Sequence, residues 1–598
     1  MSLVQRIKVA TAASITELYA YTIQSNNISV NITKPEFVGD YTVVLFAFIK
    51  ELKKSPETIG QELGTHLINN NPELFTQFNL VKGFLNLTVH NNYWLAFLKN
   101  TYTNRNYGQA ALNGLNVMVE YSSPNTNKPL HLGHLRNNFL GRSIAEILKT
   151  TGNKVVKTCI VNDRGIHICK SMIAWQLFAN GATPKSTNKK GDHFVGDYYV
   201  KFNEVYKQQI AELKSKGILE EEAEKIAPIM KAAQQMLLDW EEGKPSVIEL
   251  WKKMNEWVYE GFDVTYKKIG TDFNKTYFES NTYLLGKDLV AKGLSKKIFY
   301  KKEDGSVWID LTADGLDEKL VQRKDGTSVY ITQDIGLAEQ KQNEFKANKS
   351  IYVVGDEQNY HFKVLKLICQ KLELPSADGI FHLSYGMVEL PSGKMKSREG
   401  TVVDADELVD EMIAIAKQKT EELGKVNDFT EEERNELFET LGLGALKFFL
   451  LRVDPKKKMV FNPEESIDFH GFTGPFIQYT HARIKSVFRK LAINSAIKLA
   501  NENIASEHDF LPLEKEMVIQ LEQFPSLLND AGIELDPSKV AIYIFNLAKT
   551  YSSFYNEHSI VHAENEEKKA LRLMLSILTA TVIKTGMLLL GIKVPDRM

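Results

Sequence analysis

The sequence has 598 residues, of which 43% are hydrophobic and 25% charged, and its 73 Lys and Arg against 75 Asp and Glu give a net charge of −2. This composition is typical of a soluble globular protein with several domains and excludes fibrous and disordered classes. No continuous apolar run approaches the roughly 18 residues of a membrane span, and the N-terminus lacks a secretory pattern, so we expect neither a membrane anchor nor secretion. The three cysteines form no CxxC pair, so we expect neither disulfides nor a zinc site, and the cytoplasm is the expected location.

Residues 1–112 are predicted to form a small α+β domain. At residues 84–89 apolar and polar side chains alternate, which predicts a strand at the edge of its sheet. From residue 113 the pattern changes to short apolar runs at 117–119, 155–161 and 350–354, each bounded by turn residues, and the last precedes a helical stretch at 361–371. These runs predict a parallel α/β sheet.

Further along the chain the sequence is mostly helical in character. Residues 184–260 place Trp240, Trp251 and Trp257 among many Glu and Lys, and we expect helices inserted into the sheet domain, the insertions spanning about 180–330. Residues from about 440 to 598 carry apolar residues at helical spacing and predict a helical bundle. Ten basic and four acidic residues in 441–500 make a candidate face for a polyanion, although a solvated helix surface is the alternative.

The first motif with chemical meaning follows the strand expected to end near Tyr121. It reads SSPNTNKPLHLGHLRN over 122–137 and leads into a helical pattern. His131 and His134 would therefore lie at a helix N-terminus, where free backbone N–H groups and the helix dipole favour phosphate, and Gly133 would let a nucleotide come close. Taken alone, the pair of histidines is more often structural, and a zinc site would need a third ligand at a suitable spacing.

A second motif, LPSGKMKSREG, occupies 390–400. Its basic residues between two glycines suit a polyphosphate, and an exposed polar turn is the alternative. In this order and about 260 residues apart, the two motifs resemble the paired HIGH and KMSKS signatures of class I aminoacyl-tRNA synthetases.

Several other segments resemble the arginyl-tRNA synthetases in particular: residues 119–136, 325–335, 355–361, 474–483 and 590–598, with 39–41 and 83–86 near the N-terminus. The likeness covers almost the whole chain. It implies an N-terminal tRNA-contacting domain over 1–112, a Rossmann-like catalytic domain with insertions over 113–390, the signature loop with connecting stem-contact helices over 391–470, and an all-helical anticodon-binding bundle over 471–598.

The resemblance also implies an activity and its residues. A cytoplasmic monomer would use ATP with Mg²⁺ to activate L-arginine to arginyl-adenylate, release pyrophosphate, and transfer the arginyl group to the 3′-terminal ribose of arginine tRNA. The implied catalytic residues are His131, His134, Lys128 and Lys396, and the implied arginine-binding residues are Glu120, Asn125, Tyr330, Asp334 and Gln358. ATP would be bound by His131, Gly133, His134, Gly355, Asp356, Met387, Lys394, Met395, Lys396 and Ser397, and tRNA by Asn86, Tyr479, Arg483, Tyr543 and Met598.

These assignments agree with the chemistry of the substrates. A guanidinium is a planar, permanently charged fork, so its pocket should offer carboxylate and phenol oxygens, and Tyr330 and Asp334 would share one helix face if the segment after Tyr330 is helical. A capped helix start with a core tyrosine is the structural alternative. The carboxylate of arginine itself attacks ATP, so catalysis would consist of positioning and charge neutralisation.

The sequence departs from the family pattern at two places. Ser397 stands where the second signature usually has lysine, with Lys396 one position earlier, so Lys128 and Lys396 both remain candidates for the phosphates. His167 stands where many relatives have glutamine and receives no role. Tyr479, Tyr543, Phe554 and Tyr555 are candidate platforms for tRNA bases, and each could equally belong to the bundle core.

Two rival functions remain to be weighed. Another class I synthetase or a nucleotidyltransferase would share the ATP motifs, and the pair Tyr330 and Asp334 argues against it. The other rival is a catalytically silent, tRNA-binding regulator. It would not need His131, His134 and Asp334, so the presence of these residues argues against it.

Overall fold

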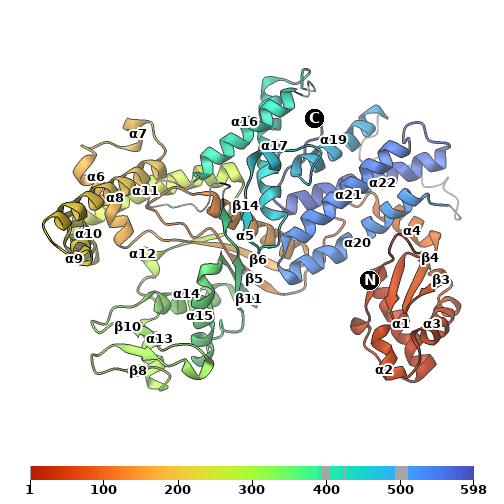
Figure 1. The fold of residues 1–598 in the computed structure, drawn as a ribbon, viewed down its shortest axis with the longest axis horizontal. Coiled ribbons are helices and arrows are strands. Elements are labelled where there is room, and N and C mark those ends of the chain that lie inside the picture. The colour runs from red at the N-terminus through yellow and green to blue at the C-terminus, as the bar shows by residue number, and fades with distance from the viewer. Residues whose placement is uncertain (1, 390, 392–402, 423, 425, 492–508) are drawn as a thin grey trace.

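A computed structural model describes the chain except for residues 1, 390, 392–402, 423, 425 and 492–508. Its described part has an N-terminal α+β domain, a parallel sheet with helices around it, and a C-terminal bundle of long helices (Figure 1). This is the fold class that the sequence predicts.

The N-terminal domain contains a four-stranded antiparallel sheet in the order β1-β2-β4-β3. The strand predicted at the edge, β4, instead lies inside the sheet, because β2 pairs with one side of it and β3 with the other. Its residues Leu85, Asn86 and Leu87 are consecutively buried, so the strand does not follow simple alternation. The elements of this domain are α1 Leu3–Tyr19, β1 Val30–Ile32, β2 Tyr41–Val44, α2 Ile49–Leu52, α3 Pro56–Asn70, β3 Phe75–Val81, β4 Phe84–Val89 and α4 Asn91–Thr101.

The central sheet has five parallel strands in the order β12-β11-β5-β6-β7. From β5 the chain passes through α5 to β6 on one side, and β11 lies on the other side of β5. The carboxyl ends of β5 and β11 therefore meet at a reversal of strand order, where open α/β sheets bind ligands. The elements are β5 Asn116–Glu120, α5 Leu132–Thr150, β6 Lys154–Val161, α6 Ile166–Phe178, β7 Lys275–Phe278, α14 Tyr330–Phe345, β11 Lys349–Gly355, α15 Asn359–Lys371 and β12 Ile380–Tyr385. The short strand β13 Val388–Glu389 follows and pairs outside this sheet, with β14 Met459–Val460.

Two insertions interrupt this sheet. The first is helical, as the sequence predicts, and lies between α6 and β7: α7 Pro184–Thr187, α8 Gly191–Ser215, α9 Glu220–Ile226, α10 Pro228–Glu241 and α11 Pro245–Ile269. The second contains a small antiparallel sheet, order β10-β9-β8, where the sequence predicts only helices; its elements are α12 Glu279–Thr282, α13 Lys287–Ser295, β8 Tyr300–Lys301, β9 Val307–Ile309 and β10 Lys319–Gln322. The strand β7 falls within the range predicted as inserted, yet it pairs with β6 in the main sheet.

The C-terminal part consists mainly of long helices that pack on one another and on α5. Its elements are α16 Ala405–Glu422, α17 Glu431–Leu451, β14 Met459–Val460, α18 Pro463–Ser466, α19 Gly474–Lys490, α20 Pro512–Glu534, α21 Pro537–Glu557 and α22 Glu566–Leu589. By length and hydropathy alone, α22 could cross a membrane, although its sequence contains no continuous apolar run of that length. Within the protein 78% of its most apolar window is buried, as in the core helix of a bundle.

The N-terminal domain rests on the bundle helix α20 (Figure 1). The backbone N–H of Leu3 donates to Glu522 at 2.8 Å, and the hydroxyl of Tyr107 donates to the carbonyl of Leu521 at 3.0 Å. Lys515 of α20 lies 3.3 Å from the carboxylate of Asp40. These contacts hold the first domain of the chain against its last one.

Candidate active site

The loop after β5 has a strained backbone. Ser122 and Ser123 adopt φ values of 77° and 47°, in the left-handed region that non-glycine residues rarely occupy. Helix α5 stabilises this turn, because Asn137 accepts the backbone N–H of Ser122 at 2.5 Å and Asn138 donates to the Ser122 hydroxyl at 3.1 Å. The turn thus carries the chain from the sheet to the first residue of α5.

His131 and His134 lie side by side at the start of α5, with ring centroids 3.9 Å apart. Nδ1 of His131 accepts the backbone N–H of Gly133 at 3.1 Å, and Nδ1 of His134 accepts that of His131 at 3.2 Å. Because both Nδ1 atoms accept, each neutral ring carries its proton on Nε2, which is thereby available as a donor. A Cβ at Gly133 would lie 3.0 Å from the His131 ring, so glycine leaves room for this arrangement.

Both imidazoles are neutral at pH 7. Burial, aided by the nearby charge of Lys128, lowers the pKa of His131 to about 4. Burial, aided by His131 and Lys128, lowers the pKa of His134 well below its ordinary value. The pair can therefore donate two neutral hydrogen bonds to a phosphate at the helix N-terminus, while Lys128 supplies positive charge beside them.

Arg136, two residues beyond His134, is completely buried and joins three parts of the site. Its guanidinium donates to the carbonyls of Gly386 at 2.6 Å, Pro455 at 3.2 Å and Lys457 at 2.9 Å, with a longer bond to Met387. It thereby fixes Met387, a predicted ATP contact, beside α5. Gly355 and Asp356 lie at the end of β11, and a Cβ at Gly355 would have no neighbour closer than 4.0 Å.

The predicted guanidinium residues lie at the start of α14. The helix begins at Tyr330, so the segment after Tyr330 is helical and Tyr330 and Asp334 can share a face. The side chain of Tyr330 is 72% exposed, and the structural alternative of a core tyrosine is therefore wrong. Asp334 accepts from Nε2 of His361 at 2.7 Å, a partner that the sequence did not predict. Asn125 and Gln358, also predicted to bind arginine, are exposed.

Glu120, the fifth predicted arginine ligand, has partners of its own. Its Oε2 accepts from Lys341 at 2.5 Å and from Thr158 at 3.1 Å, and the ammonium of Lys341 lies between the rings of Tyr277 and Tyr352. Glu120 is buried, and the ammonium of Lys341 neutralises its charge within the protein. Both of these hydrogen bonds end on Oε2.

A further acidic residue was missed by sequence reasoning. Glu279 begins α12 at the carboxyl end of β7, on the same edge of the sheet as Glu120 and Asp356. Burial raises its pKa to about 7; the charge of Arg164 opposes this increase, and the negative charges of Asp163 and Asp334 add to it. A carboxylate directly after a strand would have indicated Glu279 as a site residue, but the short strand β7 is not predicted from the sequence.

Lys394, Met395, Lys396 and Ser397, which belong to the second motif, lie outside the described residues. The described chain resumes at Val403 beside the first motif: Leu132 donates to the carbonyl of Val403 at 3.1 Å, and Ala405 donates to that of Leu130 at 3.0 Å. His131 and Asp404 thus form a bridge between the first motif and the segment that follows the second one.

The predicted tRNA residues lie in varied surroundings. Asn86 is buried in the N-terminal sheet, and the half-buried Arg483 lies over the rings of Tyr479 and Tyr555. Tyr543 stacks on Phe524 and donates to the carbonyl of Gln520 at 2.6 Å, which is the core role that the sequence left open. Phe554 is completely buried, and Met598 packs against the core cluster.

The described part of the basic window, residues 441–491, is not one continuous face. Lys447 is buried, donates to the carbonyl of Gly591 at 2.7 Å, and has its pKa lowered to about 7 by burial. Lys456, Lys457 and Lys458 are exposed, whereas Lys485 pairs with Asp596. His167, left without a role by the sequence, shares a hydrogen bond of 3.0 Å with the Tyr199 hydroxyl.

Known proteins resemble this chain along its whole length. Residues 98–462 match a family model described as "tRNA synthetases class I (R), catalytic domain", residues 5–89 match "Arginyl tRNA synthetase N terminal domain", and residues 477–598 match "DALR anticodon binding domain". Proteins named arginine–tRNA ligase from Bacteroides fragilis and Flavobacterium psychrophilum are 52% and 51% identical, each aligned over 100% of both chains. The structure of the Thermus thermophilus arginyl-tRNA synthetase superposes with a TM-score of 0.79 at 24% identity, covering 100% of both chains.

Proposed function

Because the chain belongs to the arginyl-tRNA synthetase family and is an ATP-dependent arginine–tRNA ligase of class I, we propose how its residues divide the reaction among them. The observation that carries the proposal is the position of two carboxylates, Asp334 and Glu279, at the carboxyl edge of a sheet where two neutral histidines cap α5. The carboxylates suit a cationic amino acid, and the helix N-terminus suits the phosphates of ATP.

In the first half of the reaction, the substrate carboxylate attacks the α-phosphorus of ATP; a new P–O bond forms, and the bond to pyrophosphate breaks. His131 and His134 donate hydrogen bonds from Nε2–H to the phosphate oxygens, and Lys128 neutralises part of the triphosphate charge. ATP enters as its magnesium complex, so the metal is part of the substrate. In the second half, a hydroxyl of the terminal tRNA ribose attacks the carbonyl carbon of arginyl-adenylate, and AMP leaves.

Tyr330, Asp334 and Glu279 are assigned to the guanidinium, because carboxylate and phenol oxygens match its donors. Asn125, Gln358 and Oε1 of Glu120 are assigned to the polar groups of the amino acid backbone, which lies toward β5 and β11. Gly355, Asp356 and Met387 are assigned to the nucleoside part of ATP. The second motif, with Lys394, Met395, Lys396 and Ser397, is assigned to the triphosphate.

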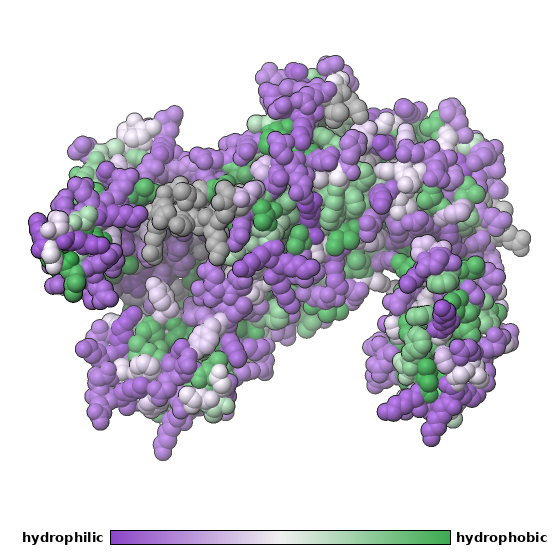
Figure 2. All heavy atoms as spheres, in the orientation of Figure 1, coloured by the Kyte–Doolittle hydropathy of each residue, from purple (hydrophilic) through white to green (hydrophobic). Residues whose placement is uncertain are grey.

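The N-terminal domain is assigned to tRNA through a cavity of about 250 Å³ on its surface. Ile32, Phe37 and Phe84 give it apolar walls, Figure 2 shows apolar atoms gathered on this domain, and Asn86 lies in the cavity lining. Oδ1 of Asn86 accepts from Thr42, whereas its buried Nδ2 has no hydrogen-bond partner among the described residues. An unstacked base, held against an aromatic ring and bonded at its edge, would satisfy this amide. Tyr479, Arg483 and Met598 stay assigned to the tRNA through the bundle, whereas the core contacts of Tyr543 remove it from this set.

We further propose that the enzyme acts as a monomer in the cytoplasm. Its three cysteines are buried and unpaired, as suits a reducing compartment.

The activity is tested by incubating the protein with total tRNA, ATP, Mg²⁺ and each of the twenty labelled amino acids in turn. We expect arginine to be attached to tRNA and the other nineteen to remain at background, because their side chains lack a guanidinium for Asp334 and Glu279. Omitting ATP is the control that separates charging from simple retention on tRNA. Charging with another amino acid at a comparable rate would contradict the assigned pocket.

Glu279 makes arginine binding dependent on pH. Since its pKa is raised to about 7, the carboxyl is largely protonated at pH 6 and ionised at pH 8, and only the ionised form attracts the guanidinium. We expect the arginine KM of the wild type to fall by about tenfold between pH 6 and pH 8, as the competent fraction rises. In Glu279→Gln the KM should stay high and change little over this range.

The control for Glu279→Gln is Glu242→Gln, an exposed carboxylate on the helical insertion. This variant should keep the pH dependence of the wild type. A pH-dependent arginine KM in Glu279→Gln would assign the titration to another group.

A further inference from the structure

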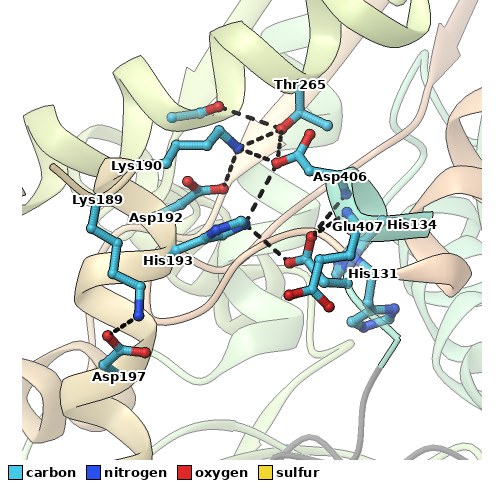
Figure 3. Close-up of polar contacts among 12 residues, drawn as sticks. His131, His134, Lys189, Lys190, Asp192, His193, Asp197, Thr265, Asp406 and Glu407 are labelled. Carbon is cyan, nitrogen blue, oxygen red and sulfur yellow. Dashed lines mark hydrogen bonds and ion pairs between the residues drawn. The ribbon is translucent and has the colours of Figure 1, made fainter. Parts of the chain in front are cut away.

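A group of charged side chains joins the start of α8 in the helical insertion to the start of α16 (Figure 3). The ammonium of Lys190 lies 2.9 Å from Asp192, 2.6 Å from Asp406 and 2.6 Å from the hydroxyl of Thr265 on α11. Nε2 of His193 lies 3.0 Å from Oδ2 of Asp404 and 3.5 Å from Oδ2 of Asp406, within ion-pair distance of both. None of these residues has been given a role in the reaction so far.

In the insertion, the start of α8 that carries this network is closely packed against α11. A Cβ at Gly191 would lie 1.9 Å from the carbonyl oxygen of Trp257, and a Cβ at Gly261 would lie 2.3 Å from Oδ1 of Asp192. The first turn of α8 is therefore packed directly on the backbone of α11, with Asp192 completely buried between them. His193 projects from a rigid support, as a residue that positions others requires.

Asp404 connects this network to the first motif. Its Oδ1 accepts the backbone N–H groups of Asp406 and Glu407 at 2.8 and 3.1 Å and so caps α16, while its Oδ2 faces His193. Its backbone belongs to the segment 403–405, which pairs with 130–132 and forms the bridge to His131. A displacement of Asp404 would therefore displace the backbone that holds His131.

The charges favour this arrangement. The carboxylates of Asp404 and Asp406, both within ion-pair distance of its Nε2, raise the pKa of His193 to about 10, so His193 is an imidazolium at neutral pH, unlike His131 and His134. Asp404 and Asp406 have their pKa values lowered, although burial opposes the shift. Several charged and titratable groups face His193 or share its cavity of about 310 Å³. They are Asp192 and Lys190 at the start of α8, Lys189, Asp197 and Tyr199, Asp404 just before α16, Asp406 and Glu407 of α16, and Lys128 and His131 of the first motif.

A metal site is the competing interpretation, since ligand atoms of Asp192, His193 and Asp406 lie within 4.8 Å of one another. However, the ammonium of Lys190 already lies between the carboxylates of Asp192 and Asp406, and the imidazolium of His193 supplies a second positive charge beside Asp406. The network thus already contains two positive groups of the protein, which favours a positioning role over a metal site.

We propose that His193 is a positioning residue for the ATP-dependent step: its imidazolium holds Asp404, and through the pairing of 403–405 with 130–132 it holds His131 in place for the phosphates. The inference rests on the proposed function of His131. A small misplacement of a catalytic group can cost on the order of 100-fold in rate, so the loss of this ion pair should be visible in the chemical step.

The test is single-turnover formation of AMP with saturating arginine and tRNA, measured from pH 7 to pH 10.5, because AMP survives alkaline conditions in which aminoacyl esters hydrolyse. We expect His193→Gln to form AMP up to about 100-fold more slowly than the wild type at pH 7.5, with an unchanged arginine KM. The ratio of the two rates should fall toward one as the pH passes about 10, where wild-type His193 loses its proton. Lys201→Ala, which removes an exposed ion pair on the same helix, is the matched control and should keep the wild-type rate.

Asp404→Asn provides a second, independent variant. Asparagine is as good an N-cap as aspartate, so α16 should remain capped while the charge facing His193 is lost. We expect a similar slowing, and the double variant His193→Gln, Asp404→Asn should be no slower than either single one, because both remove the same interaction. A wild-type rate in both single variants, a rate ratio that stays constant to pH 10.5, or additive losses would each overturn the proposal. Absence of arginine-dependent AMP in the wild type would instead refute the proposed function.

Discussion

Replacing Lys128 by alanine is expected to lower kcat by about 10²–10³, the usual loss when one electrostatic contact to a reacting group is removed, with little change in the arginine KM. The two histidines beside Lys128 are neutral, so they donate hydrogen bonds but no net charge. Lys128 acts on both electrostatically and lies on a loop between Pro124 and Pro129. Its charge is therefore ordered by folding before ATP arrives, which makes it more effective than a charge that must be ordered during the reaction.

Single-turnover arginyl transfer with saturating tRNA compares Lys128→Ala directly with Lys396→Ala, the other candidate for the triphosphate. We expect Lys128→Ala to be the slower of the two, and Lys201→Ala to serve as a control that removes a lysine elsewhere. If Lys396→Ala proves more damaging, the second motif has kept its phosphate role with the lysine moved by one position. The assignment of Lys128 as the substitute would then be wrong.

Asp334→Asn should raise the arginine KM by on the order of 10–150-fold and leave the ATP KM nearly unchanged, because a hydrogen bond to a charged group is worth about 1.5–3 kcal/mol. Asp334 offers its carboxylate from the first turns of α14, beside the exposed Tyr330 and in contact with His361. Asparagine keeps the shape of the side chain but removes the charge that the guanidinium requires. Steady-state charging at varied arginine and varied ATP separates the two constants.

Two comparisons sharpen the test of Asp334. Asp317→Asn, an exposed carboxylate in the second insertion, should leave both KM values at the wild-type level. Citrulline, which has the length of arginine without its charge, should not be used by the wild type. An unchanged arginine KM in Asp334→Asn, or equal use of citrulline, would place the guanidinium pocket elsewhere.

The main sheet could be predicted from the sequence to the extent that its strands are apolar and its helices amphipathic. The runs that became β5, β6 and β11 are rich in valine and isoleucine, and α5 shows the apolar spacing of a helix packed on a sheet. In contrast, β7 has four residues with one buried side chain, and β8 has two residues, so neither is long enough to show a period. The interior position of β4 depends on β3, a pairing that no local pattern specifies.

The candidate site, like the sheet, could be predicted from the sequence only in part. Residues within the first motif were found because they are close together in sequence. Glu279, His361 and His193 were not given roles, because each depends on a partner brought near by the topology of the sheet or the insertion. The pairing of Lys341 with Glu120 is the clearest case, since these residues are 221 positions apart and their contact follows only from the packing of α14 on β5.

The N-terminal domain is synthesised long before the helix on which it rests. Leu3 and its partner Glu522 are 519 residues apart. At about 5–20 residues per second, a ribosome needs roughly 25–100 s to add the chain between them. During that time the face that carries Asp40 and Tyr107 has no α20 to cover it. The nascent domain must keep this face from aggregating, through the stability of its own core or with a chaperone, until the last third of the protein has been translated.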